Sequence, residues 1–216
     1  MSTQTTTIET VTEPAVSLRN EPVQARSTAR LTALLDAAAS IVDEVGIERL
    51  TTAMVAERAG ASIGTVYRYF PDRIVLLQAL GSRNFERVMA RITDAINDPA
   101  HTDWRAALGT AFAAVIDTYR TEPGFRGLRV GDQLDLRPLP NGRTFKSLVA
   151  ERIVEALSAR FGVENSAATR FTLEASLEMS DALVARAFLM NPQGDEEFIS
   201  VSTSYVRGFI AENIGW

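Results

Sequence analysis

Cysteine is absent from this 216-residue sequence, and histidine occurs once, at His101. The missing cysteine excludes disulfides, thiolate metal sites and cysteine nucleophiles. His101 lies between Pro99 and Asp103 in a polar connection, where a lone histidine is usually solvated, so histidine-based catalysis is not expected. A phosphate-binding glycine loop and a paired acid–base motif are missing too. The sequence therefore predicts a protein that is not an enzyme and that needs no metal and no cofactor.

Long hydrophobic runs are also scarce, and so is the alternation of apolar and polar residues that is typical of a β-strand. No apolar run approaches the roughly 20 residues that a membrane-spanning helix needs, and the N-terminal residues lack the basic-then-apolar layout of a signal peptide. We therefore expect a cytoplasmic protein without a membrane partner. Apolar residues recur at helical spacing along most of the chain, so the predicted fold class is all-α.

Positive charge is local rather than general. The net charge is −5, yet residues 26–91 hold nine arginines and seven acidic residues, with no acid between Arg58 and Pro71. From Ile92 onward acidic residues outnumber basic ones. A small module with one basic face, joined to an acidic body, is typical of a DNA-binding protein whose second domain has another task.

The predicted organisation has three parts. Residues 1–25 are rich in Thr and Glu and are predicted to be a disordered tail. Arg19, Arg26 and Arg30 near the end of this tail either reach DNA or stay solvated; the sequence leaves both open. Residues 26–80 are predicted to form a DNA-binding domain, and residues 81–216 a larger helical domain for ligand binding and dimerisation.

Four helices are expected in the DNA-binding domain. Ser27 is the predicted N-cap of the first helix, which Gly46 ends. The fourth helix is expected to continue past residue 80 into the second domain. The other predicted caps and stops are Thr51, Gly60, Ser62 and Asp72.

Residues 51–70 meet the steric demands of a helix-turn-helix, in which two short helices cross at roughly 90–120°. Ala56 is the small residue at the crossing, and Gly60 supplies the positive φ of the turn. The apolar residues expected to fill the angle are Val55, Ala59, Ala61, Val66 and Phe70. A plain helical hairpin that contacts protein is the structural alternative.

The second helix of this pair keeps an outer face of aromatic and polar residues. Arg68 is predicted to recognise a guanine, because the two N–H donors of its guanidinium group match the O6 and N7 acceptors of that base. Ile63 is predicted to contact a thymine methyl. The N-terminal end of the helix suits a phosphate, and the hydroxyl groups and Arg73 suit the DNA backbone. The full predicted DNA-binding set is Thr51, Thr52, Ser62, Ile63, Gly64, Thr65, Tyr67, Arg68, Tyr69 and Arg73.

The stretch "LTTAMVAERAGASIGTVYRYFPDRIVLLQAL", preceded by a capped amphipathic helix, resembles the DNA-binding domain of TetR-family transcriptional repressors. The resemblance covers about residues 27–80. It implies a homodimer that binds a near-palindromic operator on double-stranded DNA and releases it when a small molecule enters the C-terminal domain. In the family pattern, the positions of Ile63 and Arg68 face bases. The positions that meet phosphates are those of Thr52, Thr65, Tyr67, Tyr69 and Arg73.

Two residues depart from that family pattern. Ala53 stands where a polar or basic residue is common early in the second helix, and Ile63 stands where a polar or basic side chain is common. Both departures remove polar contacts to bases, so the predicted recognition of the operator sequence depends mainly on Arg68.

The C-terminal half is expected to contain helices at Trp104–Thr121, Phe145–Phe161, Ser166–Met190 and Asp195–Asn213, with a short helix at Phe125–Val130. The last two long helices are apolar on more than one side, which indicates burial from two directions. One direction is the helix's own domain. The other is either a partner subunit, giving a homodimer through the last two helices, or further packing within the chain.

An aromatic and aliphatic stripe in this half is the predicted site for a small, mostly apolar effector. Ordinary core packing is the alternative for each residue in it. The acidic residues Glu174, Glu178 and Asp181 share a helix face and either attract a cationic ligand or form a solvated surface. The predicted ligand-binding residues are Trp104, Leu108, Phe112, Ile116, Tyr119, Phe145, Leu148 and Phe171.

The sequence thus predicts a ligand-responsive transcriptional regulator, most simply a repressor. Ligand binding is expected to displace the short helix at Phe125–Val130, which presses on the fourth helix, and so to change the separation of the two recognition helices. The alternative is a helical ligand-carrying or protein-interaction module that does not bind DNA.

Overall fold

The computed structural model describes residues 21–128 and 143–214, and within these ranges it contains helices and no strands. The predicted all-α class is confirmed. Along the chain the helices are α1 (Glu21–Val45), α2 (Thr52–Arg58), α3 (Ile63–Tyr69), α4 (Arg73–Asn97), α5 (Trp104–Thr121), α6 (Phe125–Leu128), α7 (Phe145–Phe161), α8 (Ala167–Leu189) and α9 (Glu196–Ile214).

Local hydrogen bonds fix the short helices where the sequence predicts them. Thr51, Ser62 and Asp72 each accept the backbone N–H of the residue three positions on with a side-chain oxygen, at 3.2, 3.1 and 2.9 Å. Gly46 and Gly60 adopt φ angles of 83° and 58°, a backbone conformation that residues other than glycine rarely adopt. The three predicted caps and the glycine turn are therefore confirmed.

The predicted cap at Ser27 is wrong. Helix α1 begins at Glu21, so Ser27 lies inside the helix, and its hydroxyl is hydrogen-bonded to the Tyr69 hydroxyl at 3.1 Å. The first described turns of α1 are exposed, and an exposed helix start carries no apolar periodicity that a sequence reading could detect. Of the predicted tail, residues 1–20 with Arg19 lie outside the described residues, and residues 21–25 are helical.

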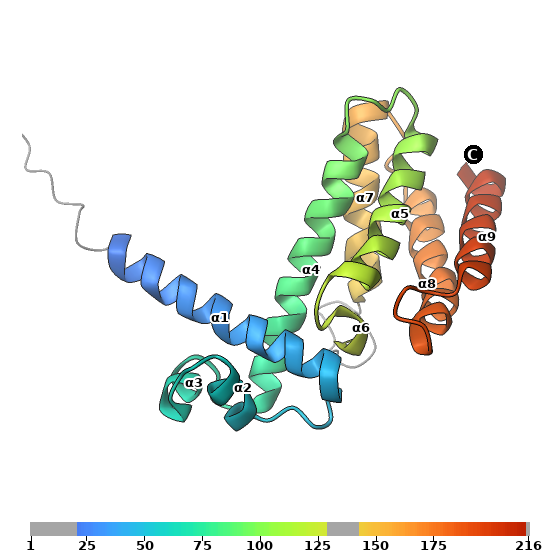
Figure 1. Cartoon of the computed structure of the whole chain (residues 1–216). Helices are drawn as coiled ribbons and strands as arrows, with labels where there is room; N and C mark the ends of the chain where they lie inside the picture. Colours follow the sequence, from blue (N-terminus) through green and yellow to red (C-terminus); the bar gives the residue numbers. More distant parts are fainter. Residues whose placement is uncertain (1–20, 129–142, 215–216) are drawn as a thin grey trace, which may run out of the picture.

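Two hydrophobic cores share helix α4. The first core joins α1, α2, α3 and the start of α4, and its fully buried side chains include Leu34, Ile41, Leu50, Val55, Val66, Leu76 and Leu80. The second core begins at Val88 on the same helix and extends over α5, α7, α8 and α9. Figure 1 shows α4 rising from the small α1–α3 unit into the larger helical body. The helix runs unbroken through residue 80, as expected.

The short helix α6 lies where these two cores meet (Figure 1). Phe125 is buried in the second core and Leu128 in the first. Backbone approaches backbone at this junction, because a Cβ added to Gly124 would lie 2.9 Å from the Ala39 Cα of α1. One turn of helix therefore contacts both halves of the protein. Its predicted extension to Val130 lies outside the described residues.

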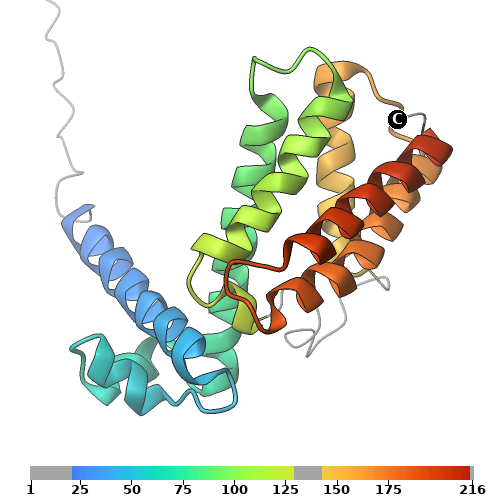
Figure 2. The same cartoon turned by 45° about the vertical axis from the view of Figure 1, so that its right-hand side comes forward.

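The four long helices predicted in the C-terminal half match the structure closely. The bounds of α5 and α7 agree with the prediction, and α8 and α9 differ from it by a residue at each end. Figure 2 shows α8 and α9 packed side by side along one edge of the body, away from α1–α3. In the described part of the chain, no helix has both the length and the apolar character needed to cross a membrane.

Candidate DNA-binding face and ligand cavity

Helix α3 is buried on one side and open on the other. Val66 is completely buried and Phe70, just after the helix, is 2% exposed; both pack into the first core. On the opposite side Ile63 is 43% exposed and Tyr67 50%, and Arg68 is also exposed. The residues predicted to face DNA bases therefore point away from the protein.

Hydrogen bonds hold the aromatic residues of this face in position. The Thr52 hydroxyl donates to the Tyr67 hydroxyl at 3.4 Å, which ties α2 to α3. The Tyr69 ring is half-buried, its hydroxyl meets α1 at Ser27, and the Arg68 guanidinium lies 5.4 Å from the ring centroid. These contacts hold the hydroxyl groups of Tyr67 and Tyr69 in place at the surface.

The other predicted contact residues lie at the starts of α2, α3 and α4. The hydroxyls of Ser62 and Thr65 are hydrogen-bonded to each other at 2.9 Å, and Gly64 is exposed, with only the Ser62 side chain near its missing Cβ. Thr51 is exposed while it caps α2. Arg73 is exposed as well, and its guanidinium donates to the backbone carbonyl of Ile47.

Two arginines near this face, Arg58 and Arg68, differ in whether a carboxylate neutralises their charge. Arg58 forms a two-pronged ion pair with Glu44, with both N–O distances 2.7 Å, and this hydrogen bond lowers the pKa of the Glu44 carboxyl. Within the described ranges Arg68 has no carboxylate partner. Arg58 thus fastens α2 to α1, whereas Arg68 offers an unneutralised guanidinium to solvent.

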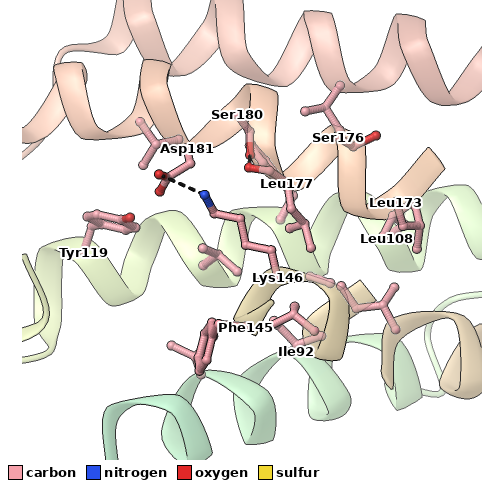
Figure 3. Close-up of a pocket in the computed structure, with 18 of the residues that line it drawn as sticks. Ile92, Leu108, Tyr119, Phe145, Lys146, Leu173, Ser176, Leu177, Ser180 and Asp181 are labelled. Carbon is pink, nitrogen blue, oxygen red and sulfur yellow. Dashed lines mark hydrogen bonds and ion pairs between the residues drawn. The ribbon is translucent and has the colours of Figure 1, made fainter. Parts of the chain in front are cut away.

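A cavity of about 120 Å³ lies between α4, α5, α7, α8 and α9 in the second core. Its walls are mostly aliphatic and aromatic, and Figure 3 shows several of these side chains converging from facing helices. The described lining residues are Val88, Ile92, Leu108, Ala111, Phe112, Val115, Tyr119, Phe125, Phe145, Lys146, Val149, Ile153, Leu173, Ser176, Leu177, Ser180, Asp181, Val184, Val206 and Ile210.

Half of the residues predicted to bind ligand line this cavity. They are Leu108, Phe112, Tyr119 and Phe145. The tyrosine stacks on Phe188, with ring centroids 5.0 Å apart, and meets Phe125 of α6 edge to face at 4.8 Å. The cavity wall is therefore in direct contact with the helix that bridges the two cores.

The other half of that prediction does not line the cavity. Trp104 and Leu148 are only partly buried, and Ile116 is buried in the second core. Phe171 is 67% exposed on the outer face of α8. A helix that is apolar on several sides gives no sign in its sequence of which side faces inward.

One end of the cavity is charged, and its central residue was missed by the sequence reading. Lys146 of α7 donates to Glu178 at 2.7 Å and to Asp181 at 3.3 Å, both on α8. Figure 3 shows the lysine reaching from α7 to Asp181. Burial alone would lower the pKa of Lys146, but the two carboxylates outweigh it and the pKa is raised. The lysine is therefore charged at neutral pH.

In the described ranges, no three histidine or acidic side chains come together as a ligand set for a metal ion. The site is instead a glycine-pivoted helix pair on a small unit, joined to a helical body that holds an apolar cavity. That combination defines a helix-turn-helix regulator with a second, helical unit that contains a cavity.

Comparisons with known proteins agree with this class. Residues 34–80 match the family described as bacterial regulatory proteins of the tetR family, and residues 102–208 match the tetracyclin repressor-like C-terminal domain. A crystal structure of a TetR-family transcriptional regulator from Streptomyces coelicolor has a TM-score of 0.73 and 34% identity, over 87% of this chain and 98% of that one. The chain belongs to the TetR family of transcriptional regulators.

Curated relatives match over shorter stretches. The nucleoid occlusion factor SlmA of Pasteurella multocida is 32% identical over 91 residues, which are 42% of this chain and 45% of that protein. The transcriptional repressor KstR of Mycolicibacterium smegmatis is 43% identical over 58 residues, 27% of this chain and 28% of that protein. The chain thus spans less than half the length of these relatives.

Proposed function

We propose that this chain is a repressor that binds a near-palindromic operator as a homodimer and releases it when a small, mostly apolar molecule enters the cavity. It acts in the cytoplasm as a regulator, not as an enzyme. Residues 26–80 serve as the DNA-binding domain, and residues 81–216 as the effector-binding and dimerisation domain. The observation that carries the proposal is the outward face of α3, where Ile63, Tyr67 and Arg68 are exposed on a helix anchored by a buried opposite side.

Each exposed residue has a role that its chemistry suits. Arg68 reads a guanine through its two parallel N–H groups, and Ile63 contacts a thymine methyl. Tyr67 and Tyr69 donate hydroxyls to backbone phosphates, since their partners Thr52 and Ser27 already fix the rings. The predicted phosphate contacts also include Thr52, Ser62, Gly64, Thr65 and Arg73, and Thr51 completes the predicted DNA-binding set.

The exposed apolar residues of α8 and α9 favour a dimer. Phe171 and Leu189 on α8 are 67% and 69% exposed, and Val201 and Tyr205 on α9 are 53% and 58% exposed. Such side chains gathered on two adjacent helices are usual at protein interfaces. A two-fold arrangement of α8 and α9 with a second copy would cover them in a four-helix contact.

Coupling between cavity and DNA runs through α6. Phe125 lines the cavity, while Leu128, one turn later, is completely buried in the core of the DNA-binding unit. A ligand that displaces Phe125 moves Leu128 with it, because both belong to the same four-residue helix. Two recognition helices must sit about 34–36 Å apart to enter successive major grooves, so a shift of a few Å lowers DNA affinity.

Helix α4 is a second element at which the DNA-binding unit can move relative to the helical body. Asn84 lies between the last residue of the first core and the first of the second, is completely buried, and has neither side-chain atom hydrogen-bonded within the described ranges. A buried polar group left unpaired costs about 1–3 kcal/mol. A second arrangement of the two units in which the Asn84 amide is hydrogen-bonded would recover this energy, and we propose that α4 moves at this point.

Binding to DNA is tested with duplexes selected from a random pool, by fluorescence anisotropy at several salt concentrations. Arg68→Ala is expected to weaken binding by about 1–3 kcal/mol, or roughly 5- to 150-fold, and to relax the preference at one base pair. Arg152→Ala, an exposed arginine on α7, is the matched control and should bind as wild type. A chain that enriches no duplex at low salt would refute the proposal and favour the module without DNA binding.

A further inference from the structure

The charged end of the cavity carries a net negative charge. Lys146, Glu178 and Asp181 together bring one positive and two negative charges. Glu178 neutralises the lysine at the shorter distance, 2.7 Å, and its side chain is half exposed outside the cavity lining. Asp181 lines the cavity, lies farther from the lysine at 3.3 Å, and has a side chain only 20% exposed. The three groups thus leave this end with one net negative charge, shared by two carboxylates, and Asp181 is the carboxylate that lines the cavity.

Neighbouring polar groups on the same helix also present acceptors. The Ser180 hydroxyl donates its proton to the Leu177 carbonyl at 3.1 Å, and the Ser176 hydroxyl donates to the Thr172 carbonyl at 2.7 Å. Each hydroxyl has one proton to give, so the serine oxygens offer lone pairs to the cavity. Figure 3 shows Ser180 beside Asp181, above the lysine. A ligand ammonium group has three N–H donors for these acceptors, whereas a ligand carboxylate has none and meets only Lys146, whose ammonium group already binds Glu178 and Asp181.

We propose that the cavity binds small apolar molecules that carry one protonated amine, with the ammonium group against Asp181. The inference rests on the proposed function, since it names the chemical class of that effector. The volume of about 120 Å³ is near the roughly 150 Å³ of an engineered apolar cavity that holds benzene. The apolar walls thus suit an occupant no larger than one aromatic ring, whose short amine arm reaches the charged end beside Asp181.

The test compares three probes that share one ring: benzylamine, benzyl alcohol and benzoate. Isothermal titration calorimetry on the full chain at pH 7 measures each affinity. Because a hydrogen bond to a charged group is stronger than a neutral one, benzylamine is expected to bind about tenfold or more tightly than benzyl alcohol. Benzoate should bind most weakly, since it adds a negative charge to an end where two carboxylates already outnumber Lys146.

Asp181→Asn keeps the shape of the side chain and removes its charge, so the preference for the amine over the alcohol should disappear. Glu174→Gln is the matched control: Glu174 lies on the same helix, accepts a hydrogen bond from Thr144 and does not line the cavity, so the amine preference should persist. Unfolding temperatures without ligand check that each variant is folded.

Three results would overturn the inference: tightest binding of benzoate, no binding of any probe to the wild type, or an unchanged amine preference in Asp181→Asn. The wild-type series stands alone if a variant does not fold. These titrations contain no DNA, so their failure is separate from failure of the repressor assignment. A chain that binds benzylamine but no duplex refutes only the latter.

Discussion

Replacing Gly124 by alanine should displace α6 from α1 and so lower DNA affinity without a ligand. Gly124 immediately precedes α6 and has a φ of +75°, and an added Cβ would lie 2.9 Å from the Cα of Ala39 and 3.2 Å from its carbonyl oxygen. These neighbours are backbone atoms of α1, which cannot turn aside as a side chain can. Gly124→Ala therefore has to push α6 away from α1.

Gly162 provides a matched control. It has a similar φ of +70° at the end of α7, but nothing lies within 4 Å of its added Cβ. Alanine at either position pays about 1–2 kcal/mol for the left-handed backbone. Only Gly124→Ala adds the cost of the contact with α1, about 1–3 kcal/mol for forced repacking. The expected losses are thus about 1–2 kcal/mol for Gly162→Ala and 2–5 kcal/mol for Gly124→Ala.

Urea unfolding measures the two stabilities, and anisotropy with a selected duplex measures DNA affinity where circular dichroism shows the variants folded. An allosteric coupling of 1–3 kcal/mol corresponds to about 5- to 150-fold, so Gly124→Ala should bind DNA weaker by a factor in that range. Gly162→Ala should bind as wild type. Equal DNA affinities for the two variants would refute the role assigned to α6.

Two further predictions concern the recognition helix and the dimer. Ser62→Ala removes the cap of α3 and should destabilise the fold by about 0.5–2 kcal/mol in urea unfolding; no loss would contradict the capping role seen in the structure. Val201→Arg places a charge on the exposed apolar face of α9 and should shift the chain from dimer to monomer in sedimentation equilibrium. The same shift should be absent in Arg152→Ala, and a Val201→Arg chain that remains dimeric would exclude this face as the interface.

Local features of the DNA-binding unit could be predicted from the sequence. Thr51, Ser62 and Asp72 cap helices because their side chains reach a backbone N–H three residues away, so no distant residue decides the outcome. The turn at Gly60 likewise depends on its own φ. Ser27 failed as a cap because α1 starts earlier, in an exposed segment without an apolar pattern.

Features of the cavity depend on contacts between distant residues and were harder to predict. Lys146 meets Asp181 across 35 positions of sequence, and nothing near the lysine marks it as a cavity residue. Phe171 shows the reverse error, since a large aromatic side chain on an apolar helix is exposed here. The position of Leu128 also depends on distant residues, because it reaches the core of the DNA-binding unit only through the packing of α6 against α1.

The most direct test of the account is the thermodynamic linkage between cavity and DNA. The affinity for a selected duplex is measured with and without a saturating cavity ligand, and the ligand affinity with and without saturating duplex. Reciprocity requires the same factor in both directions, and the account predicts a decrease of about 5- to 150-fold. A ligand that fills the cavity while DNA affinity stays unchanged would contradict it.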